Sequence, residues 1–176
     1  MQTSHIDQVR SAAIPFFIDQ IYVSPGHNFK DHFGRDPDNF EAVPVDMVEC
    51  IAGSGLIGDR FFDHKPDFKG QITFFDMAVY KKVCEHFFEG KESVAPSVFR
   101  RNIITRGLNL NSLIGKRFSI GDVEFSGSEE CSPCFWMNQA CAEGAHEFLM
   151  GQGGLRARIH TDGVLRIGEA ALTIHH

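Results

Sequence analysis

Two cysteines lie three positions apart in the segment Glu130-Cys131-Ser132-Pro133-Cys134, and a run with helical spacing follows it. Pro133 restricts the backbone between the two thiols. A thiol at the beginning of a helix lies near the positive end of the helix dipole, which favours its thiolate form, although Glu129 and Glu130 oppose this effect. Because the thiolate is the form that attacks electrophiles and binds metals, Cys134 is our candidate for the catalytic or metal-binding residue.

The same cysteine pair allows three other interpretations. A zinc site would need two further ligands, and Cys141 and His146 are nearby in sequence, but no second paired motif is present. A thioredoxin-like redox pair would need a surrounding β-α-β pattern, which the sequence lacks. Two inert structural thiols are the third alternative. With a reactive Cys134, Cys131 could resolve a persulfide on Cys134 by forming a disulfide.

Arginines form the second group of candidate binding residues. Arg100 and Arg101 precede a predicted strand and, together with Asn102, offer bidentate and amide donors suited to a phosphate or a pterin. In the structural alternative, one of these arginines is an ordinary surface charge and Asn102 caps a turn. Arg60 follows Asp59 in a glycine-rich turn, where it either binds a phosphate or forms an ion pair with Asp59.

Arg156 and Arg158 alternate with apolar residues in a predicted strand, so both side chains should point to the same face of a sheet. That face is either solvated or forms the wall of a charged pocket. We include Arg156 among the candidate cofactor-binding residues.

Composition is that of a globular protein with a single domain over residues 1–176 and a core over about residues 18–172. The chain has 176 residues, of which 43% are hydrophobic and 23% charged, which is enough apolar material for one core. The net charge of −6 and the lack of a Lys/Arg run argue against nucleic acid and anionic membranes as partners.

The cysteines and the N-terminus indicate a cytoplasmic protein. No apolar run approaches the roughly 20 residues that a membrane-spanning helix needs. Asp7 and Arg10 interrupt the apolar positions of the first 15 residues, so we expect no signal peptide. Five cysteines, without the spacing of a disulfide framework, are typical of a reducing compartment.

Short strands are the main elements expected to position these residues. Runs of β-forming residues bounded by turn signals predict strands at 16–23, 43–47, 71–75 and 103–105, a pair within 115–125 around Gly121-Asp122, a hairpin of 155–160 with 164–167, and 171–174.

Two or three helices are expected between the strands. Asp76 is a good N-cap for a helix that ends before Gly90, a short helix or turn covers 95–99, a loop or single turn covers 108–113, and a longer helix covers 135–150. The elements show no regular β-α alternation. The predicted fold is therefore mostly β with α insertions, a closed and mainly antiparallel β-barrel.

Several segments resemble, in this order, the MOSC domain, the module named after the C-terminal part of molybdenum-cofactor sulfurase. They are IYVSP (21–25), GLIGDR (55–60), QIT (71–73), FRRNI (99–103), LIGKRFSIG (113–121), CSPC (131–134) and GLRAR (154–158). The likeness spans about residues 18–172. It implies a β-barrel of the pyruvate-kinase-barrel-like type and agrees with the prediction from the strands.

The resemblance also implies roles for individual residues. In family members that reduce N-hydroxylated compounds, the thiolate matching Cys134 binds molybdenum held by a pterin, and residues matching Arg100, Asn102 and Ser132 line the cofactor. In the sulfurase, this cysteine carries sulfur delivered by a pyridoxal-phosphate (PLP) desulfurase domain. The reductases have an additional N-terminal β-barrel subdomain; here only about 17 residues precede the first predicted strand, so we expect none.

Two functional hypotheses follow. In the first, the protein binds a molybdenum–pterin cofactor through Cys134 and reduces N-hydroxylated small molecules, with electrons from a separate redox partner because no flavin or iron–sulfur motif is present. In the second, it is a non-catalytic sulfur carrier that accepts a persulfide on Cys134 from a PLP-dependent desulfurase. A binding module without chemistry is the third alternative.

Overall fold

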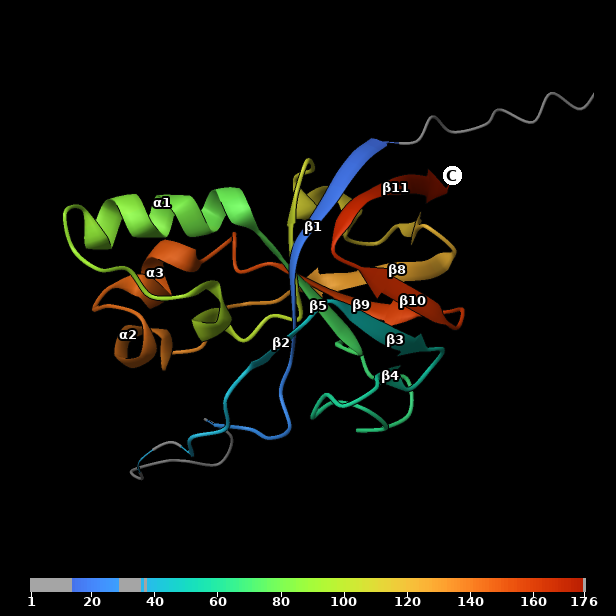
Figure 1. The fold of residues 1–176 in the computed structure, drawn as a ribbon, viewed down its shortest axis with the longest axis horizontal. Helices are drawn as coiled ribbons and strands as arrows, with labels where there is room; N and C mark the ends of the chain where they lie inside the picture. Colours follow the sequence, from blue (N-terminus) through green and yellow to red (C-terminus); the bar gives the residue numbers. More distant parts are fainter. Residues whose placement is uncertain (1–13, 29–35, 37, 176) are drawn as a thin grey trace, which may run out of the picture.

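The computed structural model describes residues 14–28, 36 and 38–175, and it is built around a closed β-barrel (Figure 1). Seven strands form the barrel in the order β11-β7-β8-β9-β5-β6-β1, and β1 pairs with β11 to close it. Their bounds are β1 Ile14–Val23, β5 Ile72–Asp76, β6 Ile103–Arg106, β7 Arg117–Ile120, β8 Val123–Glu130, β9 Leu155–Ile159 and β11 Gly168–His175. The predicted closed barrel is confirmed.

Antiparallel pairing dominates the barrel, as predicted. β5 and β6 are the exception: they run parallel, and α1 (Met77–Phe88) together with the 3-10 helix η1 (Pro96–Phe99) connects them. A parallel pair needs such a crossover because its strands cannot be joined by a tight turn. Asp76 caps α1 as expected, since its side chain accepts a hydrogen bond from the Ala78 N–H at 2.8 Å.

A small second sheet lies beside the barrel and corrects two sequence predictions. It contains β10 (Gly163–Arg166), β3 (Met47–Ile51) and β4 (Gly55–Leu56). The predicted strand at 43–47 is divided at Asp46, because β2 (Val43–Val45) pairs with β1 whereas β3 pairs with β10. The predicted hairpin of 155–160 with 164–167 is wrong: Asp162 accepts a hydrogen bond from the Ala52 N–H, and the chain passes from the barrel to the second sheet.

The helices gather on one side of the barrel, to the left in Figure 1. The predicted helix over 135–150 is instead two short helices, α2 (Met137–Ala140) and α3 (Ala145–Leu149). Gly144 separates them with a φ of 85°, a left-handed conformation that a continuous helix cannot contain. The 3-10 helix η2 (Leu110–Leu113) fills the predicted single turn. No helix in the described residues is long and apolar enough to cross a membrane.

Strand β5 separates two hydrophobic clusters. Phe74 points into the barrel and contacts Phe118 and Phe125, while Phe75 points outward and stacks on Phe99 at 4.7 Å between ring centroids. Successive residues of a strand face opposite sides, so an apolar strand such as β5 can be buried on both. The helices thus pack on the outside of β5 and β6.

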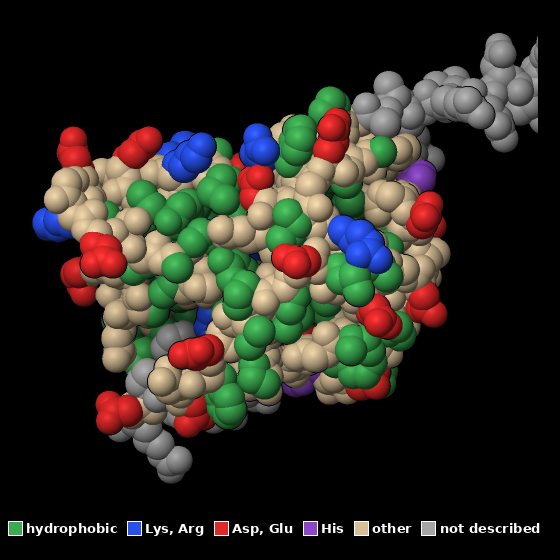
Figure 2. Space-filling model, viewed as in Figure 1, with side chains coloured by type: hydrophobic (Ala, Val, Ile, Leu, Met, Phe, Trp, Pro, Cys, Tyr) green, Lys and Arg blue, Asp and Glu red, His purple; other side chains and the backbone are tan. Residues whose placement is uncertain are grey.

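Charged side chains are dispersed over the face of the molecule in Figure 2. Lysines and arginines there alternate with acidic residues and hydrophobic patches, and the residues described on this face form no continuous basic surface. Charges of both signs are thus interspersed on this face.

Candidate functional site

The cysteine loop, residues 131–134, begins where β8 ends. The Cys131 N–H donates to the Gly154 carbonyl at 2.8 Å, and Nη2 of Arg101 donates to the Cys131 carbonyl at 2.7 Å. The Cys131 side chain is buried, whereas Cys134 is exposed. The backbone at Cys131 is therefore fixed, and the loop presents Cys134 to solvent.

The glycine segment 151–154 holds the cysteine loop from the other side. A Cβ atom at position 153 would overlap with the Cys131 carbonyl oxygen and touch Pro133, so only glycine fits there. The Gly153 N–H donates to the Glu130 carboxylate at 3.0 Å. The helix predicted over 135–150 ends at this segment, which is also the surface on which the cysteine loop is built.

Cys134 opens into a cavity of about 160 Å³, which we call the Cys134 recess. It brings together most of the predicted site residues with an aromatic wall, and it is lined by Arg60, Phe61, Phe68, Gly70, Thr73, Arg100, Arg101, Cys131, Ser132, Cys134, Met137 and Arg156. A smaller cavity of about 140 Å³ continues from it past His27 and Asn28. Cys134 and the arginines predicted from distant parts of the sequence thus meet in one place.

Arg101 is the arginine most fully engaged with the protein backbone. Its guanidinium donates to the carbonyls of Phe99, Cys131 and Gly153 at 2.7, 2.7 and 2.9 Å. These three carbonyls belong to η1, the cysteine loop and the glycine segment. Arg101 therefore ties three segments together.

The guanidinium of Arg100 also donates hydrogen bonds to other segments of the chain. It donates to the carbonyl oxygens of Phe40 and Gly26 at 2.9 and 2.6 Å, and to the Ser24 hydroxyl at 2.6 Å. Burial, together with the charge of Arg60, lowers the pKa of Arg100 to about 10, and Asp59 opposes that shift. The backbone carbonyls offset part of the cost of burying this cation.

Arg60 and Arg156 have fewer backbone contacts and face the recess. Nη1 of Arg60 lies 3.6 Å from the Asp59 carboxylate, so the predicted ion pair is present, and its other terminal nitrogen donates to the Arg100 carbonyl at 3.4 Å. Burial lowers the pKa of Arg60. Arg156 pairs with Glu129 at 3.1 Å and keeps 37% of its side-chain surface exposed. These two guanidiniums thus donate to fewer backbone carbonyls than those of Arg100 and Arg101.

Arg156 also interacts with the sulfur of Cys131. Burial lowers the pKa of Arg156, but the charge and hydrogen bonding of Cys131 and the carboxylate of Glu129 raise it, and the net shift is upward. Arg158, two residues along β9, instead pairs with Asp67 and lies outside the recess. Of the two alternating arginines, only Arg156 contributes to the pocket wall.

Asn102 lies behind the recess rather than on its surface. Its carbonyl oxygen accepts from the Thr73 N–H and hydroxyl at 3.0 and 2.8 Å, and its amide donates to the Tyr22 carbonyl at 3.2 Å and to Asp59 at 3.0 Å. Asp59 in turn accepts from the Ser24 N–H. This buried network joins β1, β5 and the start of β6 and holds Asp59 beside Arg60.

The helix-dipole argument for Cys134 is wrong. The Cys134 carbonyl accepts from the Met137 N–H, but the helix that follows, α2, has only four residues. A single turn has few aligned peptide dipoles, so its end carries little of the charge of a long helix. The positive charge near Cys134 comes instead from the arginines of the recess.

An aromatic cluster on the rim of the recess was missed from the sequence. Phe61 has ring contacts with His27, His64 and Phe68 at 4.8, 5.4 and 5.0 Å between centroids, and the Arg60 guanidinium lies 4.7 Å from the Phe61 ring centre. The close spacing of aromatic residues between 61 and 68 was the available signal. These rings give the basic recess one apolar wall.

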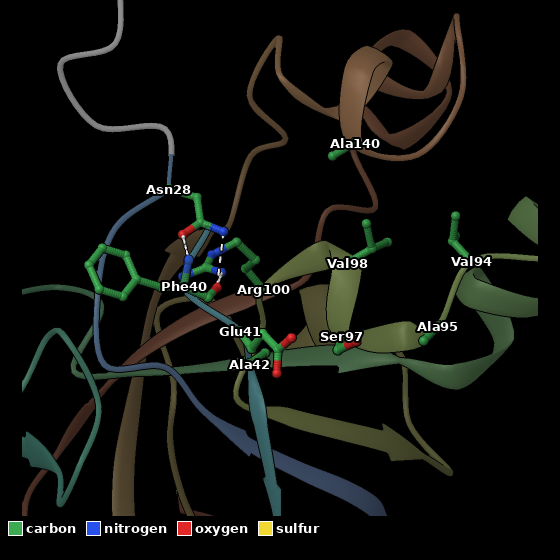
Figure 3. A pocket seen from close by; sticks show the side chains of 10 residues that line it. All are labelled: Asn28, Phe40, Glu41, Ala42, Val94, Ala95, Ser97, Val98, Arg100 and Ala140. Atoms are coloured by element: carbon green, nitrogen blue, oxygen red, sulfur yellow. Dashed lines mark hydrogen bonds between the residues drawn. The ribbon is translucent and has the colours of Figure 1, made fainter. Parts of the chain in front are cut away.

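A larger cavity of about 560 Å³ lies on the other side of Arg100 (Figure 3). Asn28 forms two hydrogen bonds with the backbone of Phe40, at 2.8 and 3.0 Å, and Arg100 donates to the same carbonyl. Its described lining contains Glu41 and several apolar residues but neither cysteine of the loop. Arg100 thus forms part of the wall between this cavity and the Cys134 recess.

Alkylation should distinguish the cysteines. Burial raises the pKa of Cys141 to about 11 from 9.0, and that of Cys50 to about 12. Because each pKa unit lowers the thiolate fraction tenfold at neutral pH, the shift at Cys141 lowers it about 100-fold. We therefore expect iodoacetamide to label the exposed Cys134 at least about 100 times faster than Cys141, as followed by peptide mass spectrometry. Equal labelling rates would contradict this assignment.

The alternative of a zinc site has no geometric basis in the described residues. No group of three or more His, Cys, Asp or Glu side chains there is arranged to hold a metal ion. His146 lies next to Glu147 and to the exposed ring of Phe135. A metal at Cys134 would therefore have to bring further ligands with it.

A closed seven-stranded barrel with a cysteine loop and a basic recess defines the class of protein. The sequence matches the family model of the MOSC domain over residues 32–171, so the chain belongs to the MOSC family, which is associated with molybdenum-cofactor proteins. Among curated proteins, none matches the sequence at a significant level.

Solved structures share this fold at low sequence identity. The YUAD protein from Bacillus subtilis superimposes with a TM-score of 0.70 at 15% identity, covering 94% of this chain and 99% of its own. YiiM from Escherichia coli gives 0.63 at 19% identity, with 94% of this chain and 70% of its own covered. YiiM from Geobacillus stearothermophilus gives 0.65 at 16%, with 92% and 75%.

Proposed function

We propose that Cys134 is the functional thiol and that it binds the molybdenum of a pterin cofactor in the Cys134 recess. The observation that carries this proposal is the position of an exposed thiol in a cavity that also contains Arg60 and Arg156. An exposed cysteine alone would not suggest a ligand. A cysteine beside arginines that still have free N–H donors suggests an anionic ligand.

The residues of the recess fit the chemistry of this cofactor. Molybdenum in a dithiolene site is soft and accepts a thiolate ligand. The pterin phosphate needs cationic or N–H donors, which Arg60 and Arg156 can supply because their guanidiniums are less occupied than those of Arg100 and Arg101. Ser132 lines the same recess and offers a hydroxyl.

When bound, the metal would supply reduction of an N-hydroxylated substrate to the amine and water, with two electrons from a separate redox partner and two protons. The chain itself would contribute binding and orientation. Phe61 and Phe68 form an apolar wall against which a small organic substrate can pack. Arg101 and the glycine segment keep the cysteine loop in place, so that Cys134 is presented without a large ordering cost.

A sulfur carrier is the second candidate, and the exposure of the cysteine loop favours it. Phe135, which follows Cys134, is 74% exposed. A PLP-dependent desulfurase that transfers a persulfide must reach the acceptor sulfur directly, and an exposed aromatic residue beside that sulfur is a suitable contact for it. We place either activity in the cytoplasm, because the five cysteines are free.

Metal and pterin analysis tests the proposal. The protein would be expressed in a host that makes the molybdenum cofactor and purified as wild type, Cys134→Ser and, as a matched control, Cys141→Ser. We expect stoichiometric molybdenum in the wild type and the control, and loss of at least 90% of it, or about tenfold, in Cys134→Ser. A wild type without metal that carries one extra sulfur atom on Cys134 would favour the carrier. Equal molybdenum in all three proteins would rule out Cys134 as its ligand.

A further inference from the structure

Cys131 and Cys134 line the same recess but differ in access. Cys134 is exposed, whereas Cys131 retains only 5% of its surface. Both contribute to a cavity of about 160 Å³, and only Ser132 and Pro133 separate them along the chain. A reagent from solution therefore meets Cys134 first, in a cavity whose lining also includes Cys131.

The surroundings of Cys131 differ from those of an inert core cysteine. Cys50 is fully buried within the hydrophobic cluster of the barrel, whereas Cys131 belongs to neither hydrophobic cluster. Instead, it lines the Cys134 recess together with Arg60 and Arg156. A thiol that lines a cavity can reach a group bound there, whereas a thiol sealed in a hydrophobic cluster cannot.

We propose that Cys131 is the resolving thiol of Cys134. A low-molecular-weight disulfide, RSSR, reacts with the Cys134 thiolate to give the mixed disulfide Cys134-S-S-R and one RS⁻. The Cys131 thiolate then attacks the sulfur of Cys134, forms the Cys131–Cys134 disulfide and releases the second RS⁻. The two cysteines lose two electrons and two protons, and RSSR becomes two RSH.

The fixed backbone of Cys131 supports this order of events. The Gly154 carbonyl, Arg101 and the close approach of Gly153 hold the backbone of Cys131 in place beside the recess that this residue lines. A spacing of two intervening residues is the one used by redox-active cysteine pairs. The same attack on a Cys134 persulfide would release hydrosulfide. Disulfide formation would also withdraw Cys134 from any ligand, whether or not it binds molybdenum.

The test uses the reduced, full-length protein and oxidised glutathione as the disulfide. In intact-mass spectrometry, we expect the wild type to lose the mass of two hydrogens and to retain no glutathione, and peptide mapping to find a disulfide between Cys131 and Cys134. Cys131→Ser should instead accumulate one glutathione on Cys134, with at least tenfold more adduct than the wild type. Cys134→Ser should acquire neither modification within the loop.

Cys84→Ser is the matched control, because it removes a half-buried thiol outside the recess, and it should behave as the wild type does. A wild type that keeps glutathione on Cys134, as Cys131→Ser does, would overturn the proposal. If Cys131→Ser does not fold, peptide mapping of the wild type alone still decides the question. A disulfide that involves any cysteine other than Cys131 and Cys134 would also overturn the proposal.

Discussion

An Asn102→Leu variant is expected to lose about 3–5 kcal/mol of unfolding free energy. Leucine has nearly the same volume but can neither accept from Thr73 nor donate to Tyr22 and Asp59. The Asp59 carboxylate would remain buried with fewer donors, and this desolvation cost dominates the effect. Urea unfolding followed by circular dichroism measures the change.

Two further variants distinguish a loss of the buried hydrogen-bond network from the general effect of substituting an asparagine. Asn102→Asp keeps the shape but places a second carboxylate beside Asp59, so it should be at least as unstable as Asn102→Leu. Asn109→Leu, at an exposed helix cap, should cost only about 1 kcal/mol. If Asn102→Leu were no less stable than Asn109→Leu, Asn102 would not be the centre of the network.

A Gly154→Ala variant is expected to lose about 3–5 kcal/mol of unfolding free energy, for a different reason. Gly154 has a φ of 104°, and a Cβ atom there would overlap with the carbonyl oxygen of Phe74. The strand β5 and the Cys131 backbone, which donates to the Gly154 carbonyl, would both have to move. We therefore expect the alkylation rate of Cys134 to change together with stability.

Gly151→Ala is the matched control for this prediction. Gly151 also has a positive φ, 79°, but nothing lies within 4 Å of the position that a Cβ atom would occupy. It should cost only the backbone strain of about 1–2 kcal/mol and leave the cysteine loop unchanged. A Gly154→Ala loss no larger than that of Gly151→Ala would show that the close contact with β5 is unimportant.

Local patterns in the sequence predicted much of the fold. The β-forming residues of 16–23 and the apolar run 71–75 predicted β1 and β5, Gly121-Asp122 predicted the β7–β8 hairpin, and Asp76 predicted the start of α1. These features depend on side chains that are neighbours along the chain. The number of short strands without regular β-α alternation predicted the barrel, and the segments shared with the MOSC domain agreed with that prediction.

The pairing of the strands with one another could not be predicted from local patterns. β9 and β10 are joined by a short connection with hairpin residues, yet β10 pairs with β3, more than 100 residues earlier in the chain. Likewise, the helical spacing after Cys134 is real, but Gly144 and the packing of α2 and α3 divide it. Long-range contacts override local preference when they bury more apolar surface.

For the candidate site, the sequence by itself determined which residue types could carry chemistry: a cysteine in a constrained loop, with arginines in three other segments of the chain. Only the tertiary structure decided which of these residues hold the fold together and which face the recess. Arg100 and Arg101 donate to backbone carbonyls and hold segments together, Asn102 is buried behind the recess, and Arg60 and Arg156 face it. The reason is that a guanidinium binds whichever acceptors lie within reach, and those acceptors are backbone groups brought close by folding.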